Sequence, residues 1–327
     1  MSNLQATVLL TGVTGFVGGR LVHTLIANGI RPRCLVRSAE RFKRQFALHD
    51  KVEIVEADLL NQAKLATALQ GIDTAYYLIH SMGGRTFREN RLFAERDRAA
   101  AQNFIRASDE AGIRRVIYLG GLGEVGAGLS KHLASRQEVG RILHSGRVSA
   151  TALRAANIIG AGGAPFEMLR HLVERLPVLI CPRWVNTRCQ PIDVNDAVAY
   201  LFGCLTNPDT AGLEFDIGGP DIITYREMMR IYIRVRGLKR LIITVPVLTP
   251  HLSALWINLM TPVPSGVVIP LLEGLKNEVI CRDNGIRDLV PLTLTPMEVS
   301  ICNALLEVEK GPGKIASKQA CFLREVS

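Results

Sequence analysis

The sequence is poor in aromatic residues, which make up 6% of its 327 residues. Proteins that bind nucleic acid usually combine a continuous basic face with aromatic side chains that stack on bases. The chain is basic, with a net charge of +9, but its Arg and Lys residues fall into small groups around 31–44, 85–98 and 226–240. We therefore expect no nucleic-acid partner, and we interpret the charge as a solvated surface with a site for an anionic cofactor.

Cysteines at the spacing of a metal or redox site are also lacking. The seven cysteines include no Cys-x-x-Cys pair and no Cys/His cluster of the zinc-binding kind. We expect no bound metal, and cysteines that are reduced and mostly buried, which favours a cytoplasmic location. The first apolar run is too short for a secretory signal peptide, so we expect none.

Long uninterrupted apolar runs are absent as well. The most apolar stretch, 241–275, is broken by five prolines, so it does not fit a membrane-spanning helix of about 20 continuous apolar residues. We expect it to form a small apolar subdomain that covers a cofactor. Two alternatives are a wall for an apolar substrate and a patch that touches a membrane, where a basic surface would favour anionic lipid.

The clearest feature present is the segment TGVTGFVGG, residues 11–19, which lies between an apolar run and an amphipathic run. Its glycines have Gly-x-x-Gly-x-x-Gly spacing. In a strand–turn–helix, such glycines let a pyrophosphate approach the backbone, and the helix N-terminus attracts the anion. The segment therefore predicts a dinucleotide site formed by Gly12, Thr14, Gly15, Phe16, Val17 and Gly18.

The second apolar run, 30–36, ends in Arg37 and Ser38. Folds of this kind place an acidic residue about 20 positions after the glycines to bind the ribose hydroxyls of NAD, whereas an arginine there accommodates the 2′-phosphate of NADP. Arg37 lies 19 residues after Gly18, and Arg33 and Arg41 are expected to surround the same place. The sequence therefore favours NADP, with NAD as the alternative.

Five or six apolar runs alternate with helical segments up to about residue 160. This alternation predicts an α/β fold: a Rossmann-type, doubly wound parallel sheet with a smaller, mostly helical C-terminal subdomain. We expect residues 1–160 and 187–218 to form the dinucleotide-binding domain. Residues 161–186 and 219–315 would form the subdomain over the substrate, and 316–327 a loosely held tail.

Polar side chains follow two further strands of the expected sheet. Asp58, with Leu59, follows the third strand and is placed to reach the adenine or to cap the next helix. Tyr77, Leu78 and His80 lie at the end of the fourth strand, at the edge where open α/β sheets bind ligands. Tyr77 and His80 are therefore candidates for proton transfer, or hydrogen-bonding residues beside the cofactor.

Several motifs together resemble the short-chain dehydrogenase/reductase superfamily in its extended or atypical branch. They cover about residues 5–235: TGVTGFVG, EADLL, YLGGLG, RAANIIG, QPIDVNDA and FDIGGPDIITYREM. Within that branch the chain is similar to the NAD-dependent epimerase/dehydratase-like group, near the dehydrogenase-like accessory subunit of respiratory complex I and the NmrA-like regulators. The resemblance implies that Gly120, Ala156 and Asn157 lie beside the cofactor.

The chain departs from the superfamily at the catalytic residues, because no Tyr-x-x-x-Lys occurs in it. The resemblance places His132 where the catalytic tyrosine belongs and Arg136 where the lysine belongs. Gly120 and Gly121 stand where the serine belongs. His132 is therefore a candidate proton donor, and we expect a neighbouring cation to lower its pKa. Arg136 can bind ribose hydroxyls but cannot readily exchange protons.

Three functions are compatible with these residues. The first is an NADP-dependent oxidoreductase acting on an apolar carbonyl or quinone-like substrate held against 241–275. The second is a protein that binds NADP(H) without turnover, as a redox sensor or an assembly subunit, with peripheral membrane contact possible. The third, a nucleotide-sugar epimerase or dehydratase, needs the absent tyrosine. The expected partners are a dinucleotide and an apolar small molecule, and the chain is expected to be a monomer or homodimer.

Overall fold

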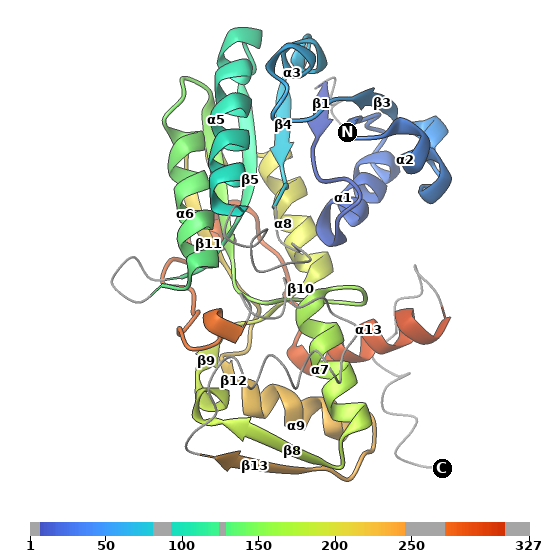
Figure 1. The fold of residues 1–327 in the computed structure, drawn as a ribbon, viewed down its shortest axis with the longest axis vertical. Coiled ribbons are helices and arrows are strands. Elements are labelled where there is room, and N and C mark those ends of the chain that lie inside the picture. Colours follow the sequence, from blue (N-terminus) through green and yellow to red (C-terminus); the bar gives the residue numbers. More distant parts are fainter. Residues whose placement is uncertain (1–6, 81–92, 124–128, 246–271, 311–327) are drawn as a thin grey trace.

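The computed structural model describes residues 7–80, 93–123, 129–245 and 272–310 (Figure 1). Its main element is a seven-stranded sheet with the order β11-β6-β5-β4-β1-β2-β3, in which every pair of neighbours is parallel. The strands are β1 (Val8–Leu10), β2 (Arg33–Val36), β3 (Glu53–Glu56), β4 (Thr74–Tyr77), β5 (Arg115–Gly121), β6 (Ser149–Ala155) and β11 (Glu214–Ile217). The strand order reverses between β1 and β4, as in dinucleotide-binding folds, so the predicted doubly wound parallel sheet is confirmed.

Helices cover both faces of this sheet. One face packs against α3 (Gln62–Leu69), α5 (Phe93–Ala111) and α6 (Lys131–His144), and the other against α1 (Phe16–Ala27), α2 (Ala39–Gln45) and α8 (Val194–Thr206). Each face has its own apolar cluster, because successive side chains of a strand point to opposite sides. Tyr76 of β4 belongs to the α1/α8 side and its neighbour Tyr77 to the α5/α6 side.

A third apolar cluster lies below the carboxyl edge of the sheet, in the lower half of Figure 1. It is built by α7 (Ala164–Arg175), α9 (Tyr225–Val235) and α13 (Met297–Lys310), together with the parallel pair of β8 (Val178–Pro182) and β13 (Leu241–Val245). The capping box that the sequence indicates at Thr224 and Glu227 opens α9. The remaining elements are short: β7 (Ile158–Ile159), β9 (Arg188–Cys189), β10 (Ile192–Asp193), β12 (Ile223–Thr224), α12 (Ile286–Leu289) and three 3₁₀ turns, His49–Lys51, Arg183–Asn186 and Pro208–Thr210.

Several sequence-based expectations fall partly outside the described residues. Of the stretch 241–275, residues 241–245 form β13 and 246–271 lie outside, as does the tail 316–327. The proposed domain boundaries stay a prediction. Among the described helices, none combines the length and apolar character needed to cross a membrane.

The cysteine expectation holds for five residues: the described free thiols are Cys34, Cys181, Cys189, Cys204 and Cys281. Burial raises the pKa of the Cys34 thiol to about 12 and favours its protonated form. The expectation that all seven are reduced is wrong for Cys302, which is disulfide-bonded. The cytoplasmic location therefore stays a prediction.

Candidate dinucleotide and proton-transfer site

The glycine turn joins β1 to α1 and is held by its own backbone. Gly12 has φ of 69°, a conformation that glycine adopts without strain, and Gly15 N–H donates to the Gly12 carbonyl oxygen at 2.9 Å. A Cβ at Gly12 would lie 2.7 Å from the Leu78 carbonyl oxygen, and one at Gly18 would overlap the Gly12 carbonyl oxygen. These two positions therefore require glycine for the turn and helix to pack.

The first turn of α1 fits an anion. Gly15 is its N-cap and supplies no capping side chain, and the first turn contains no acidic residue. The initial N–H groups of the helix and its positive dipole end are therefore available to a pyrophosphate. Thr14 is exposed in the turn, whereas Val17 is partly buried against the sheet. Phe16 lines the adjoining cleft.

Thr11 fixes the turn to the neighbouring strand, a role that the glycine pattern did not reveal. Its hydroxyl donates to the Tyr76 carbonyl oxygen at 2.9 Å and accepts from Leu78 N–H at 3.0 Å. It is fully buried. The backbone of Leu78 is thereby placed directly against Gly12, beside the expected path of the dinucleotide.

The end of β2 presents a cation at the carboxyl edge. Arg37 is exposed immediately after this strand, and Ser38 is the N-cap of α2, accepting from Arg41 N–H at 3.3 Å. Arg33 does not surround this place as we expected. It begins the strand at the opposite edge, where its guanidinium bonds Glu53 and the carbonyl oxygens of Ala68 and Gln70.

Asp58 follows β3 but does not cap α3, which was one of the two roles we expected for it. Its Oδ1 accepts from Leu60 N–H at 2.9 Å, which shapes the turn before α3, while Asn61 caps that helix. The Asp58 side chain remains exposed at this edge, and Leu59 is buried in the α5/α6 cluster. A contact of Asp58 with adenine stays a prediction.

A cleft of about 240 Å³ extends from α1 along the ends of β5 and β6. It brings together many of the residues singled out in the sequence: Phe16, His80, Gly120, His132, Arg136, Ala156 and Asn157. The glycine turn lies at one end of the same sheet edge. The cleft and turn together therefore fit an extended dinucleotide whose far end reaches His80 and His132.

The two histidines form a hydrogen-bonded chain that ends on a buried carboxylate. His80 Nε2 lies 2.9 Å from His132 Nδ1, and His80 Nδ1 lies 2.9 Å from Asp97 Oδ2. Asp97 is 2% exposed, on α5. A carboxylate only accepts, so Nδ1 of His80 carries a proton toward Asp97. When His80 is neutral, its Nε2 accepts from His132 Nδ1–H.

The pKa values of both histidines are lowered. Burial is the largest cause for His80, opposed by the hydrogen bond to Asp97. Burial, the neighbouring His80 and Arg136 lower the pKa of His132 to about 3. The expected lowering by a nearby cation is therefore present, as a smaller contribution than burial. The pair is mostly neutral at pH 7, with one nitrogen of His132, Nε2, not used in the chain.

Arg136 joins two strand ends. Its guanidinium donates to the carbonyl oxygens of Ile79, at 3.2 Å, and Leu119, and lies 4.9 Å from the centre of the Tyr118 ring. The residue is 8% exposed yet still lines the cleft. It therefore fixes the edge on which His80 lies and supplies positive charge there, while contact with a ribose stays a prediction.

Tyr77 is placed in the core. It is 1% exposed, its ring lies 5.0 Å from that of Phe104 at a steep angle, and burial raises its pKa well above the ordinary value. Because side chains alternate along β4, Tyr77 points to the α5 side while the cleft lies at the strand end. It is not among the residues that line the cleft, and we do not assign it a proton-transfer role.

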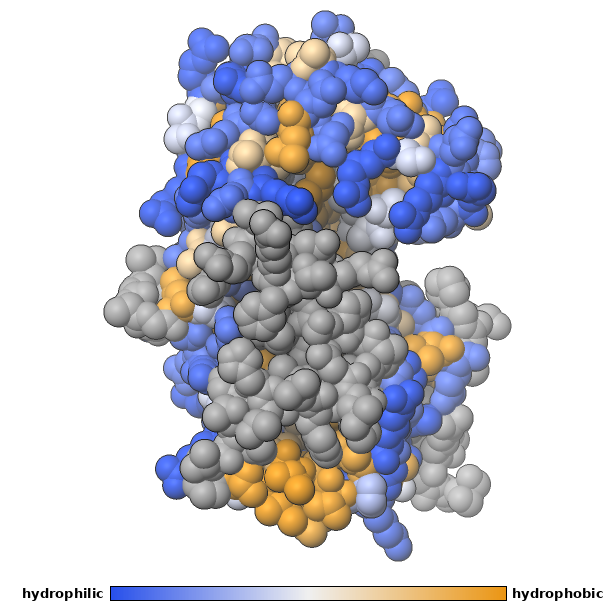
Figure 2. Space-filling model, in the orientation of Figure 1, coloured by the Kyte–Doolittle hydropathy of each residue, from blue (hydrophilic) through white to orange (hydrophobic). Residues whose placement is uncertain are grey.

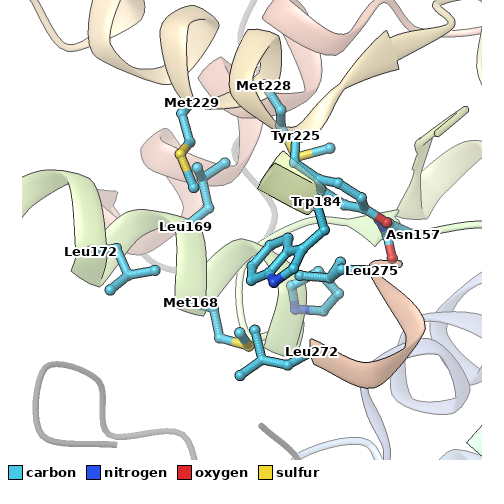
Figure 3. Close-up of a pocket in the computed structure, with 11 residues that line it drawn as sticks. Asn157, Met168, Leu169, Leu172, Trp184, Tyr225, Met228, Met229, Leu272 and Leu275 are labelled. Carbon is cyan, nitrogen blue, oxygen red and sulfur yellow. The ribbon is translucent and has the colours of Figure 1, made fainter. Parts of the chain in front are cut away.

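A second, apolar pocket of about 70 Å³ adjoins the cleft. Asn157 and Tyr225 line both, and Asn157 Nδ2 donates to the Tyr225 hydroxyl at 3.0 Å. Figure 3 shows this polar pair on one side of the pocket and Leu172 and Met229 on the other. The rest of the lining is almost entirely apolar: Pro165, Met168, Leu169, Trp184, Met228, Leu272 and Leu275. The pocket therefore fits the apolar part of a molecule whose polar end faces the cleft.

Asp97 and Tyr225 were missed by the sequence analysis. Asp97 lies on the apolar stripe of α5 that also carries Phe93, Ala101 and Phe104, and an acidic residue in such a stripe was a readable signal. Tyr225 begins the helix that the capping box identified, but nothing local in the sequence indicates that this helix start lies beside the cleft.

Known proteins give the same picture of the fold. A family model described as NAD(P)H-binding matches residues 12–166. A ceramide reductase of Caulobacter vibrioides is 30% identical over 249 residues, which are 75% of this chain and 75% of that protein. Subunit 9 of the NADH dehydrogenase (ubiquinone) 1 alpha subcomplex of Arabidopsis thaliana mitochondria is 25% identical over 95% of this chain and 79% of its own.

Solved structures agree with this at the level of the fold. The triphenylmethane reductase of Citrobacter sp., complexed with NADP(H), superposes with a TM-score of 0.71 at 18% identity, over 91% of this chain and 99% of its own. Family, fold and turn geometry agree that the chain is an NAD(P)H-binding protein.

Proposed function

Because the chain belongs to the short-chain dehydrogenase/reductase superfamily, in its atypical branch, we propose that it is an NADP-dependent oxidoreductase. Its substrate is an apolar carbonyl or quinone-like compound. The observation that carries the proposal is the chain Asp97–His80–His132 at the mouth of the cleft. It supplies a proton path where the superfamily's usual tyrosine and lysine are replaced by His132 and Arg136.

The cofactor site supports binding by backbone and charge. Gly12 and Gly18 shape the turn, the first N–H groups of α1 hold the pyrophosphate, and Arg37 binds the 2′-phosphate of NADP. When bound, the nicotinamide supplies or accepts the hydride. Arg136 stabilises negative charge that develops near the end of β5.

Proton transfer follows from the tautomers that Asp97 imposes. In the proton-loaded state, His80 is an imidazolium that donates through Nδ1 to Asp97 and through Nε2 to His132 Nδ1. Neutral His132 then carries its proton on Nε2 and would give it to the substrate oxygen. The proton on His80 Nε2 moves to His132 Nδ1, and the pair is left neutral. Oxidation of an alcohol reverses these steps.

The adjoining pocket supports an apolar substrate. Its lining of Met, Leu and Trp side chains offers no charged partner, and the Asn157–Tyr225 pair lies where the pocket meets the cleft. A substrate in this pocket would place its polar end toward His132. The Caulobacter relative is named for the reduction of ceramide, a lipid, which is consistent with an apolar substrate here.

The test is oxidation of NADPH, followed by its absorbance, with a panel of apolar ketones, aldehydes and quinones. NADPH deuterated at C4 shows whether deuterium reaches the carbon of a carbonyl product. We expect oxidation that is at least about 100-fold slower in His132→Asn, with unchanged NADPH affinity. Equal rates in wild type and variant would contradict the proton path.

A second candidate function is binding of NADP(H) without turnover, in a larger assembly. The observation favouring it is the match to the Arabidopsis NADH dehydrogenase subunit, which extends over 95% of this chain. Tight NADPH binding, with no oxidation by any compound of the panel, would favour this alternative. Measuring both NADPH binding and NADPH oxidation therefore separates the two candidate functions.

A further inference from the structure

The two-stranded sheet of β8 and β13 has one buried face and one exposed face. The register pairs Leu241 with Val178 and Ile243 with Ile180. The alternate side chains of β8, Leu179 and Cys181, are buried in the third apolar cluster. Because the side chains of a strand alternate, the four aliphatic residues share the opposite face. They are 38–57% exposed: Val178, Ile180, Leu241 and Ile243.

Four neighbouring aliphatic side chains on one face differ from scattered surface residues. The other large exposed apolar residues of the described chain, Leu60, Leu213, Ile222 and Val308, lie on separate segments. Figure 2 shows the hydrophobic surface gathered at the end of the molecule where Figure 1 places β8 and β13. A contiguous apolar patch indicates an interaction surface, whereas isolated exposed residues need no explanation.

The segments that build and flank this face are basic. Residues 175–188 and 228–245 contain no Asp or Glu and carry eight cationic residues: Arg175, Arg183, Arg188, Arg230, Arg234, Arg236, Lys239 and Arg240. Arg188, Arg234 and Arg236 are paired with glutamates of other segments.

Other cations of these segments keep their charge available. Arg183 and Lys239 are exposed, and no ion pair among the described residues involves them, whereas the guanidinium of Arg240 is held by backbone carbonyl oxygens. Arg183 directly follows β8, and Lys239 and Arg240 directly precede β13. Cations therefore stand at both ends of the apolar face.

The size and position of the face indicate whether a second copy of the chain or a membrane surface covers it. Four side chains at this exposure present on the order of 300 Å², whereas a stable dimer buries about 800 Å² per partner. The face also lies at one end of the long axis of the molecule (Figure 1). Aliphatic side chains with cations at their border match the boundary between acyl chains and anionic headgroups.

We propose that the outer face of β8 and β13 docks on a membrane surface that contains anionic lipid. Val178, Ile180, Leu241 and Ile243 enter the headgroup–acyl boundary, and Arg183 and Lys239 contact lipid phosphates. This docking does not depend on the proposed oxidoreductase activity.

The test is co-sedimentation of the full chain with vesicles of phosphatidylcholine, with and without phosphatidylglycerol. We expect binding that requires phosphatidylglycerol and weakens with salt. Ile180→Thr with Leu241→Thr should lower the partition coefficient at least about tenfold, since two buried aliphatic groups are lost. Thr keeps the β-branched shape suited to a strand. Arg183→Gln with Lys239→Gln should lower it roughly tenfold.

The matched control is Leu60→Thr with Leu213→Thr, which removes exposed aliphatic groups elsewhere and should leave binding unchanged within about twofold. Thermal unfolding shows whether each variant is folded. Absence of wild-type binding would overturn the proposal. Vesicle binding that is unchanged in Ile180→Thr/Leu241→Thr would also overturn it, because the chain would then adhere through its net positive charge and not through this face. Loss of a dimer in that variant, with unchanged vesicle binding, would identify the face as a contact between copies and overturn it too.

Discussion

The glycine turn and the histidine pair lie at the same edge of one sheet but are built in opposite ways. The turn is made of backbone that is contiguous in sequence, and its glycines approach one another and Leu78, just after the neighbouring strand. The pair and its carboxylate partner join side chains from three separate places: His80 after β4, Asp97 on α5 and His132 on α6. Binding of the dinucleotide would therefore depend on local shape, and the proposed proton transfer on tertiary placement.

This difference predicts how substitutions in the turn and in the histidine pair will differ in effect. A substitution in the turn should disturb binding and packing together, because the backbone performs both roles. A substitution in the pair should remove turnover while the dinucleotide still binds.

Gly18→Ala should abolish dinucleotide binding, with affinity at least about 100-fold weaker. It should also destabilise the fold by roughly 2–4 kcal/mol, because a Cβ would overlap the Gly12 carbonyl oxygen. NADPH fluorescence titration and chemical unfolding measure both effects. Gly19→Ala is the matched control: a Cβ there meets the Val13 carbonyl oxygen at an ordinary 3.5 Å, so stability should be unchanged or higher. Equal effects at 18 and 19 would show that the turn does not need the close approach.

Asp97→Asn should lower kcat by about 100-fold while NADPH affinity stays within about twofold. The amide oxygen can still accept from His80 Nδ1–H, but the charge that stabilises the imidazolium is lost. Steady-state kinetics with NADPH titration separate the two quantities. Glu95→Gln, an exposed acid on the same helix, is the control and should behave as wild type. A parallel loss of binding in Asp97→Asn would break the proposed separation.

Arg37→Asp should reverse the preference for NADPH over NADH by about 10–100-fold, because the 2′-phosphate loses its cation and meets a carboxylate. Dissociation constants for both dinucleotides measure the change. Arg31→Asp, exposed at the opposite end of β2, should leave the ratio unchanged. An unchanged ratio in Arg37→Asp would show that NADP is not selected at this position.

Acid should destabilise the folded chain through the histidine pair. The pKa of His132 is lowered to about 3 from the ordinary 6.5, so the unfolded chain binds the proton more tightly. The contribution of the pair to stability is therefore complete above pH 6.5 and is lost as pH falls below it, at up to about 1.4 kcal/mol per pH unit. Chemical unfolding across this range should be less pH-dependent in His132→Asn than in wild type. An identical slope would place the titration elsewhere.

The dinucleotide site and the parallel sheet could be predicted because the sequence signals for them are local. Glycine spacing at 12, 15 and 18 and the alternation of strands and helices fix the turn and the parallel sheet. The capping residues at Thr224 and Glu227 likewise fix the start of α9. Each of these depends on neighbours within a few positions of the chain.

The candidate proton-transfer site could be predicted only in part. His80 and His132 were identified from strand ends and from family register, but their contact depends on how α6 packs beside β4 and β5. Tyr77 was placed at the correct strand end, yet the sequence could not tell which face of the sheet its side chain takes. Arg33 was assigned to the wrong edge, because the whole of β2 separates it from Arg37 and each residue of an extended strand adds about 3.3 Å.

The most direct test of the proposed proton path is a single-turnover reaction of the protein saturated with NADPH and mixed with an apolar carbonyl or quinone. The rate is compared in wild type and His132→Asn at equal occupancy. We expect oxidation in wild type that is at least about 100-fold slower in the variant, with the same NADPH dissociation constant. Equal rates in both proteins, or tight binding without oxidation in wild type, would contradict it.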